Sequence, residues 1–146
     1  MNEGKLFNSA NKPTPEQKEQ IVNFLFDHLG KYGDSKAAIT KAINYAVKES
    51  LSFGGFVLTS YLDNEISGAV VVNQTGMNDY IPENILVYIA THINHRGKGI
   101  GKLLLRDTIK LAQGNIALHV EPENPARFLY EKVGFASKYI EMRLIK

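Results

Sequence analysis

The chain has 146 residues, of which 44% are hydrophobic and 22% are charged, as is ordinary for a single globular domain spanning residues 1–146. Seventeen basic against fifteen acidic residues leave a formal net charge of +2, too small for a nucleic-acid-binding protein judged on bulk charge. Cysteine is absent, which excludes disulfides, thiolate metal sites and a cysteine nucleophile, and we predict no metal site. No stretch approaches the roughly 18 apolar residues of a membrane span. The first five residues lack the apolar run of a signal peptide, so we expect a cytoplasmic protein with no membrane partner.

Two helices are predicted in the first third of the chain. The segment Thr14–Gln17 reads Thr-Pro-Glu-Gln, a capping box with proline at the first helical position. Apolar residues then recur at helical spacing over residues 21–29. A second helix is expected to begin at Asp34 or Ser35, because residues 39–47 again carry an apolar stripe with a period near 3.6.

The pattern then changes to strands. Residues 56–62 and 66–72 are rich in β-branched and aromatic side chains and predict an antiparallel hairpin. Residues 85–91 are apolar on both faces, as a central strand requires. Beyond them we expect a helix over 100–112, a strand over 116–120, a short helix over 125–132 and a last strand over 139–145. This order predicts an α/β fold with a mixed central sheet flanked by about four helices.

The segment Arg96–Gly101 places three glycines in a turn between a strand and a helix. Closely spaced glycines let backbone N–H groups point at a phosphate, and the following helix N-terminus adds its positive dipole end. Lys98 and Lys102 add charge. The dinucleotide pattern G-x-G-x-x-G and the P-loop both require glycine where Lys102 stands, so neither fits. The turn is therefore interpreted as a diphosphate cradle of another kind.

Two motifs carry a family resemblance. Arg96–Gly101 matches R/Q-x-x-G-x-G/A, and the block 123–135 looks like N-x-x-A-x-x-x-Y-E-K-x-G-F. The chain thus resembles the GNAT superfamily of N-acetyltransferases over almost its whole length. The resemblance implies a single-domain GNAT-like fold, acetyl-coenzyme A (acetyl-CoA) as co-substrate, and direct acetyl transfer to a primary amine of a small molecule or a protein. Thr91 and Ile93 stand where the family usually has valine and proline.

The resemblance also implies which residues bind the cofactor. These are the end of the third predicted strand, the glycine-rich turn and an asparagine of the second motif: Ile89, Ala90, Thr91, Arg96, Gly97, Lys98, Gly99, Ile100, Gly101, Lys102 and Asn124. Asn124 lies one residue closer to the motif alanine than in the commonest form.

Tyr130 is the predicted general acid, because a phenol with a pKa near 10 stays protonated at neutral pH and can donate to the departing thiolate. The base is less defined. His119 stands where some family members carry a glutamate, and Glu121 lies two residues on along the same strand face. His92 is a third candidate, and each histidine also has a purely structural interpretation.

The acceptor is expected between the first two helices and the loop before the central strand. These segments hold Asp34, Asp79 and Glu83 beside Tyr32 and Tyr80, a combination that favours a cationic amine. Similar proteins are commonly dimers, so a homodimer is an expected assembly. Two other functions stay open: a non-catalytic acetyl-CoA-binding sensor or regulatory module, and a nucleotide-binding regulator.

Overall fold

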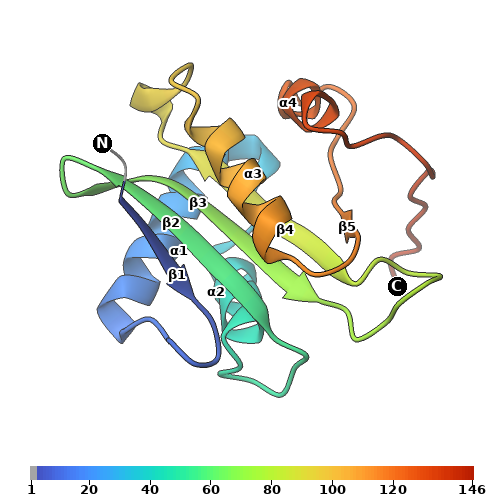
Figure 1. Cartoon of the computed structure of the whole chain (residues 1–146), viewed down its shortest axis with the longest axis horizontal. Helices are drawn as coiled ribbons and strands as arrows, with labels where there is room; N and C mark the ends of the chain where they lie inside the picture. The colour runs from blue at the N-terminus through green and yellow to red at the C-terminus, as the bar shows by residue number, and fades with distance from the viewer. Residues whose placement is uncertain (1–2) are drawn as a thin grey trace.

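A computed structural model describes residues 3–146 and forms one mixed sheet with helices on both faces (Figure 1). The strands lie side by side in chain order: β1 (Glu3–Phe7), β2 (Gly55–Leu62), β3 (Glu65–Gln74), β4 (Asn84–Thr91) and β5 (Ile116–Ala117). The first four are antiparallel to their neighbours, and β5 runs parallel to β4. The predicted hairpin is therefore confirmed as β2 and β3.

The helices are α1 (Pro15–Leu29), α2 (Lys36–Ala46), α3 (Ile100–Leu111) and α4 (Ala126–Lys132), with short 3₁₀ turns η1 (Gly30–Tyr32) and η2 (Ile93–His95). Helices α1 and α2 lie behind the sheet in Figure 1, α3 lies in front of it, and α4 lies beyond the β5 edge. These helices and the mixed sheet confirm the predicted α/β fold. No helix within residues 3–146 is long and apolar enough to cross a membrane.

The predicted helix starts are confirmed by their capping contacts. The hydroxyl oxygen of Thr14 accepts a hydrogen bond from the Gln17 backbone N–H at 3.1 Å, and the Gln17 side chain accepts from the Thr14 N–H at 2.9 Å. Ser35 caps α2 by accepting from the Ala38 N–H at 3.2 Å. Local side-chain chemistry therefore sets where both helices begin.

Two apolar clusters lie on opposite faces of the sheet. One packs α1 and α2 against the sheet and includes the fully buried Leu25, Ile39, Ile43, Val57 and Val71. The other packs α3 and α4 against the opposite face and includes Val70, Val72, Ile100, Leu105 and Tyr130. The sheet is thus covered on both faces, which agrees with the apolar character of its central strands.

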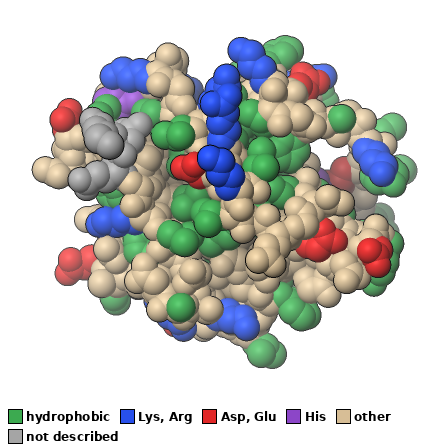
Figure 2. All heavy atoms as spheres, viewed as in Figure 1, with side chains coloured by type: hydrophobic (Ala, Val, Ile, Leu, Met, Phe, Trp, Pro, Cys, Tyr) green, Lys and Arg blue, Asp and Glu red, His purple; other side chains and the backbone are tan. Residues whose placement is uncertain are grey.

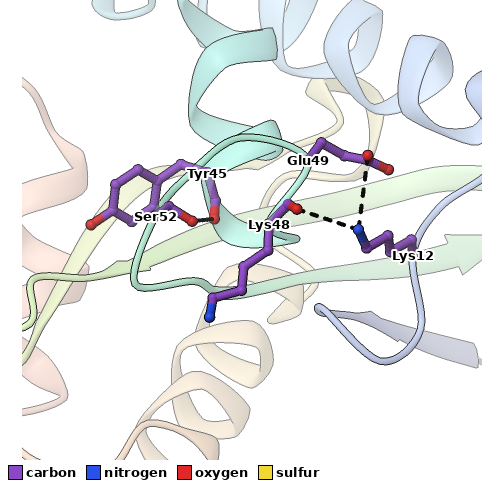
Figure 3. A network of polar contacts seen from close by, with 5 residues as sticks. All are labelled: Lys12, Tyr45, Lys48, Glu49 and Ser52. Atoms are coloured by element: carbon purple, nitrogen blue, oxygen red, sulfur yellow. Dashed lines mark hydrogen bonds and ion pairs between the residues drawn. The ribbon is translucent and has the colours of Figure 1, made fainter.

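The loop before α1 is tied to the connection between α2 and β2. The Lys12 ammonium donates to the Lys48 carbonyl oxygen at 3.3 Å and lies 3.8 Å from the Glu49 carboxylate (Figure 3). In the same connection the Ser52 hydroxyl donates to the Tyr45 carbonyl oxygen at 2.7 Å. The contacts of Lys12 therefore join the start of α1 to the end of α2.

Strand β4 has a bulge and then a free edge. Its pairing with β3 shifts so that Tyr88 opposes Val71 while Leu86 opposes Val72, which leaves Val87 as the extra residue. On its other side β4 pairs with β5 only at Asn84 and Ile85. Beyond these two positions the edge of β4 has no strand partner among residues 3–146.

The start of the pairing between β4 and β5 is held by one buried side chain. Asn84 is 1% exposed, and its amide nitrogen donates to the carbonyl oxygens of Gln113 and Asn115 at 2.8 and 3.2 Å. A buried amide that satisfies two loop carbonyls holds the entry of β5 against the start of β4.

Two predicted strands differ from the structure, and one observed strand is not predicted. The strand predicted over 116–120 spans only 116–117, and residues 139–145 form no strand. Tyr139, Ile140 and Met142 are instead exposed by 84% or more. β1 was not predicted. A strand requires a partner, and each of these segments depends on one distant in sequence, which a local pattern does not reveal.

Candidate active site

The glycine-rich turn lies between the end of β4 and the start of α3. Gly97 and Gly99 adopt left-handed backbone conformations with φ of 83° and 81°, which glycine accepts without a steric penalty. A Cβ atom added at either position would meet no heavy atom within 4 Å. The space in front of these two exposed glycines is therefore open.

Three elements converge at Gly101, in the first turn of α3. A Cβ atom added there would lie 3.1 Å from the Leu129 side chain of α4 and 3.3 Å from the Thr91 hydroxyl oxygen of β4. Glycine thus allows the N-terminus of α3 to approach both elements closely. Leu129 directly precedes Tyr130, so the predicted acid lies on the helix that contacts the turn.

The turn presents a run of unpaired N–H groups. Within residues 3–146 the backbone N–H groups from Gly97 to Lys102 donate to no protein acceptor, and the first bonded amide of α3 is that of Leu103, which donates to the Gly99 carbonyl at 3.0 Å. Such groups at a helix N-terminus, together with the helix dipole, attract an anion. The arrangement is suited to phosphate oxygens.

Basic side chains surround this run. The Lys98 ammonium lies 3.3 Å from Nδ1 of His95, and Lys102 is exposed on α3. Figure 2 shows lysine and arginine side chains in a column over α3, where Lys102, Arg106 and Lys110 are exposed at four-residue spacing. Arg96 is directed elsewhere, because its guanidinium donates to the carbonyl oxygen of His28 at 3.0 Å.

The free edge of β4 offers alternate backbone groups. The His92 N–H donates to the Ser67 carbonyl oxygen at 2.8 Å, so His92 and, by alternation, Ala90 direct their backbone polar groups at β3. Ile89 and Thr91 direct theirs at the unpaired edge. Of the three β4 residues predicted to contact the cofactor, these two have backbone groups available for it.

Tyr130 is 8% exposed and packs in the α3-side cluster, with the ring of Phe135 at 6.0 Å in an edge-on arrangement. Its hydroxyl forms no hydrogen bond within residues 3–146. Burial raises the pKa of the Tyr130 phenol to about 12, because the charged phenolate is poorly solvated there. The phenol therefore stays protonated at any physiological pH and is available as a donor.

The structure separates the other predicted residues. His119 and Glu121 are exposed, and they lie on the face opposite to Leu118 and Val120, which pack toward α3. Neither side chain forms a hydrogen bond within the described chain. The Asn124 carboxamide oxygen accepts from the Ala126 N–H at 2.9 Å and so caps α4.

Two of the three acidic residues expected at the acceptor site, Asp34 and Glu83, already have hydrogen-bond partners. The Tyr88 hydroxyl donates to the Asp34 carboxylate at 2.6 Å, and burial together with this hydrogen bond raises the pKa of Tyr88 well above its usual range. Glu83 accepts from the Asn115 N–H at 2.6 Å, which lowers the pKa of its carboxyl. Over residues 3–146 no cluster of three or more histidine and acidic side chains is arranged to hold a metal ion.

Sequence reasoning missed His28, whose ring at the end of α1 contacts η2, the short 3₁₀ turn that precedes the glycine-rich turn. Its Nδ1 atom accepts a hydrogen bond from the Ile93 N–H at 3.1 Å, across 65 positions in the chain. A lone histidine in the last turn of a predicted helix gives no signal of a contact so distant in sequence.

Comparison with known proteins agrees with this geometry. The acetyltransferase (GNAT) domain family matches residues 54–137, which is more than half of the chain. No curated protein matches the chain in sequence.

Solved structures share the fold at low sequence identity. A transcriptional regulator from Bacillus halodurans C-125 is 22% identical, with a TM-score of 0.68 over 99% of this chain and all of that one. The ribosomal-protein-S18-alanine N-acetyltransferase from Escherichia coli is 14% identical, with a TM-score of 0.69 over 95% and 80% of the two chains. The aminoglycoside N-acetyltransferase AAC(6')-Iy, solved with CoA, is 14% identical, with a TM-score of 0.69 over 100% and 96%. Because the family match spans more than half of the chain, the protein belongs to the GNAT family of acetyltransferases.

Proposed function

We propose that this chain binds acetyl-CoA at the glycine-rich turn and transfers the acetyl group directly to a primary amine of a small molecule or a protein. The observation that carries the proposal is the run of unpaired N–H groups from Gly97 to Lys102, in which Gly101 lies close to Thr91 at the end of the free edge of β4. The diphosphate of the cofactor matches the first feature. The amide groups of its pantetheine arm match the second, because they can pair with strand-edge groups as a neighbouring strand would.

The chemistry has three requirements. A primary alkyl amine with a pKa near 10.4 is protonated at pH 7, and deprotonating it costs roughly 4.6 kcal/mol. Attack on the thioester generates an oxyanion, for which the outward-facing N–H of Ile89 is the proposed donor. The departing thiolate then requires a proton, and Tyr130 is the proposed source.

The high pKa of Tyr130 limits what it can do alone. A thiol with a pKa near 8.5 is the stronger acid in water, so complete transfer from a phenol near pKa 12 would be uphill there. A thiolate that leaves into the same apolar cluster is itself desolvated, and desolvation raises its pKa as it raises that of the phenol. The two values therefore approach one another in the site, and a hydrogen bond from Tyr130 stabilises the developing charge.

His119 is the proposed base, with Glu121 as the alternative. Both are exposed and neither has a competing hydrogen bond within residues 3–146, so each can accept a proton from a bound amine directly or through water.

Gly99→Ala is expected to weaken CoA binding about tenfold or more, for two reasons. Its Cβ occupies the space proposed for the phosphates, and a left-handed backbone conformation is strained for any residue with a Cβ. Gly54→Ala is the matched control: Gly54 has nearly the same φ, 82°, and lies in the loop before β2, where a Cβ meets only the flexible Lys48 side chain at 3.4 Å. Calorimetric titration with CoA distinguishes the two variants. Equal affinities in folded Gly99→Ala and wild type would place the cradle elsewhere.

Tyr130→Phe is expected to keep CoA affinity and lower turnover by about 10²–10⁴-fold, because it removes only the hydroxyl of a packed ring. The measurement is steady-state thiol release from acetyl-CoA with a panel of primary amines. Tyr139→Phe removes the same group from an exposed ring and should leave turnover unchanged. Wild-type protein that binds CoA but releases no thiol with any amine would instead indicate the sensor function.

His119→Ala is expected to slow turnover at neutral pH, because it removes the group proposed to accept the proton of the amine. His119→Gln can hold a bridging water and should lose less. The kcat of each variant is compared with that of Glu121→Gln at matched thermal stability. Wild-type turnover in folded His119→Ala, beside a large loss in Glu121→Gln, would assign the base function to the carboxylate.

A further inference from the structure

Three histidine rings lie in a row where the end of α1 meets η2. The ring centroids of His28 and His92 are 4.1 Å apart, those of His92 and His95 are 5.0 Å apart, and the rings are tilted by 38° and 46°. The ring of Phe24, one turn earlier on α1, lies 4.6 Å from that of His28. This row of histidines therefore joins α1 to the segment that leads into the glycine-rich turn.

His28 contacts both ends of η2. Its Nδ1 atom accepts from the Ile93 N–H at 3.1 Å, and its backbone carbonyl accepts from the Arg96 guanidinium at 3.0 Å. Arg96 is directly followed by Gly97, the first residue of the unpaired N–H run. The position of that run is thus coupled to the end of α1 through one residue.

The hydrogen bonds also define the protonation state of the rings. The Asn94 N–H donates to Nδ1 of His92 at 3.1 Å, just as Ile93 donates to Nδ1 of His28. A ring nitrogen that accepts an N–H carries no proton, so both rings are neutral, with the proton on Nε2. Protonation of Nδ1 would turn each acceptor into a donor facing another donor.

The groups around His28 oppose its protonation. The pKa of His28 lies below its usual value near 6.5, and partial burial of the ring is the largest cause. His92 and Arg96 lower this pKa further, and Asp27 raises it. Lys98 lies against His95 at the other end of the row of histidines. An added charge on His28 would therefore repel Arg96 as well as release Ile93.

We propose that His28 is a positioning residue for the phosphate-binding turn, whose neutral imidazole holds η2 in place through the Ile93 N–H, so that protonating His28 weakens binding of the cofactor diphosphate. The proposal rests on the proposed function of this turn. It differs from ordinary electrostatic attraction, because a histidine that merely faced a phosphate would strengthen anion binding when protonated. The sign of the pH effect therefore separates the two roles.

The linkage to folding has a definite sign. A histidine whose pKa is lowered in the folded protein binds fewer protons there than in the unfolded chain. The stability that it contributes is fully present above the unfolded pKa near 6.5 and is lost as the pH falls through the lower folded pKa. The turn should therefore loosen below about pH 6.5.

The test compares two substitutions that separate the hydrogen bond from the titration. His28→Asn keeps an acceptor oxygen close to the place of Nδ1 and does not titrate, whereas His28→Ala has no acceptor. CoA dissociation constants are measured by calorimetry between pH 5.5 and 8, with inorganic pyrophosphate as a second probe that lacks the rest of the cofactor. Ratios between variants at each pH cancel the titration of the ligands.

At pH 7.5 we expect His28→Asn to bind within about twofold of wild type and His28→Ala about three- to tenfold more weakly, as expected for one lost hydrogen bond. As the pH falls below 6.5 toward the lowered pKa of His28, wild type should progressively lose affinity relative to His28→Asn, by up to a similar factor. In turnover assays the loss in His28→Ala should appear in the KM for acetyl-CoA and leave kcat unchanged.

The proposal would be overturned if the ratio of the CoA dissociation constants of wild type and His28→Asn did not change with pH. It would also be overturned if folded His28→Ala bound CoA as tightly as wild type. Wild type that binds pyrophosphate but not CoA would contradict the proposed function while the pyrophosphate series still tests His28. Binding of neither probe would contradict both.

Discussion

Buried backbone polar groups require hydrogen-bond partners. Along the outer edge of β4, strand β5 provides such partners only at Asn84 and Ile85. Asn84 holds the two strands together at their start, and the bulge at Val87 lies just beyond that joint. An extended ligand can complete the pairing that β5 leaves unfinished. The early separation of these strands therefore leaves an edge at which the proposed cofactor arm can pair without removing a structural strand.

The N-terminus of α3 likewise has backbone N–H groups without a protein partner among residues 3–146, and we propose that these bind the cofactor phosphates. Its unpaired N–H groups lie beside Thr91 because Gly101 allows α3 and β4 to approach closely, and Leu129 brings α4 into the same junction. The proposed acid on α4 and the proposed anion site on α3 are therefore positioned by one packing contact. The GNAT family assignment from residues 54–137 is consistent with this junction, because that range contains all three elements.

Local chemistry was readable from the sequence, and pairing across the sheet was not. The capping box of Thr14 and the glycines of the turn depend on neighbours within a few residues, and the structure confirms the helix start and the strand-turn-helix setting. Strand β1 pairs with residues fifty or more positions away, and no pattern within Glu3–Phe7 specifies that partner. His28 escaped notice for the same reason, whereas the assignments of Tyr130 and His119 to chemistry stay predictions.

The central claim is that the backbone amides of residues 97–102 bind the cofactor diphosphate beside the free edge of β4. A titration of ¹⁵N-labelled protein with acetyl-CoA, followed by amide chemical shifts, tests it residue by residue. The account predicts the largest changes at Gly97–Lys102, with Ile89 and Thr91 shifting more than Ala90, and much smaller changes with NAD. Shifts confined to another surface, or an equal response of the same amides to NAD, would contradict it.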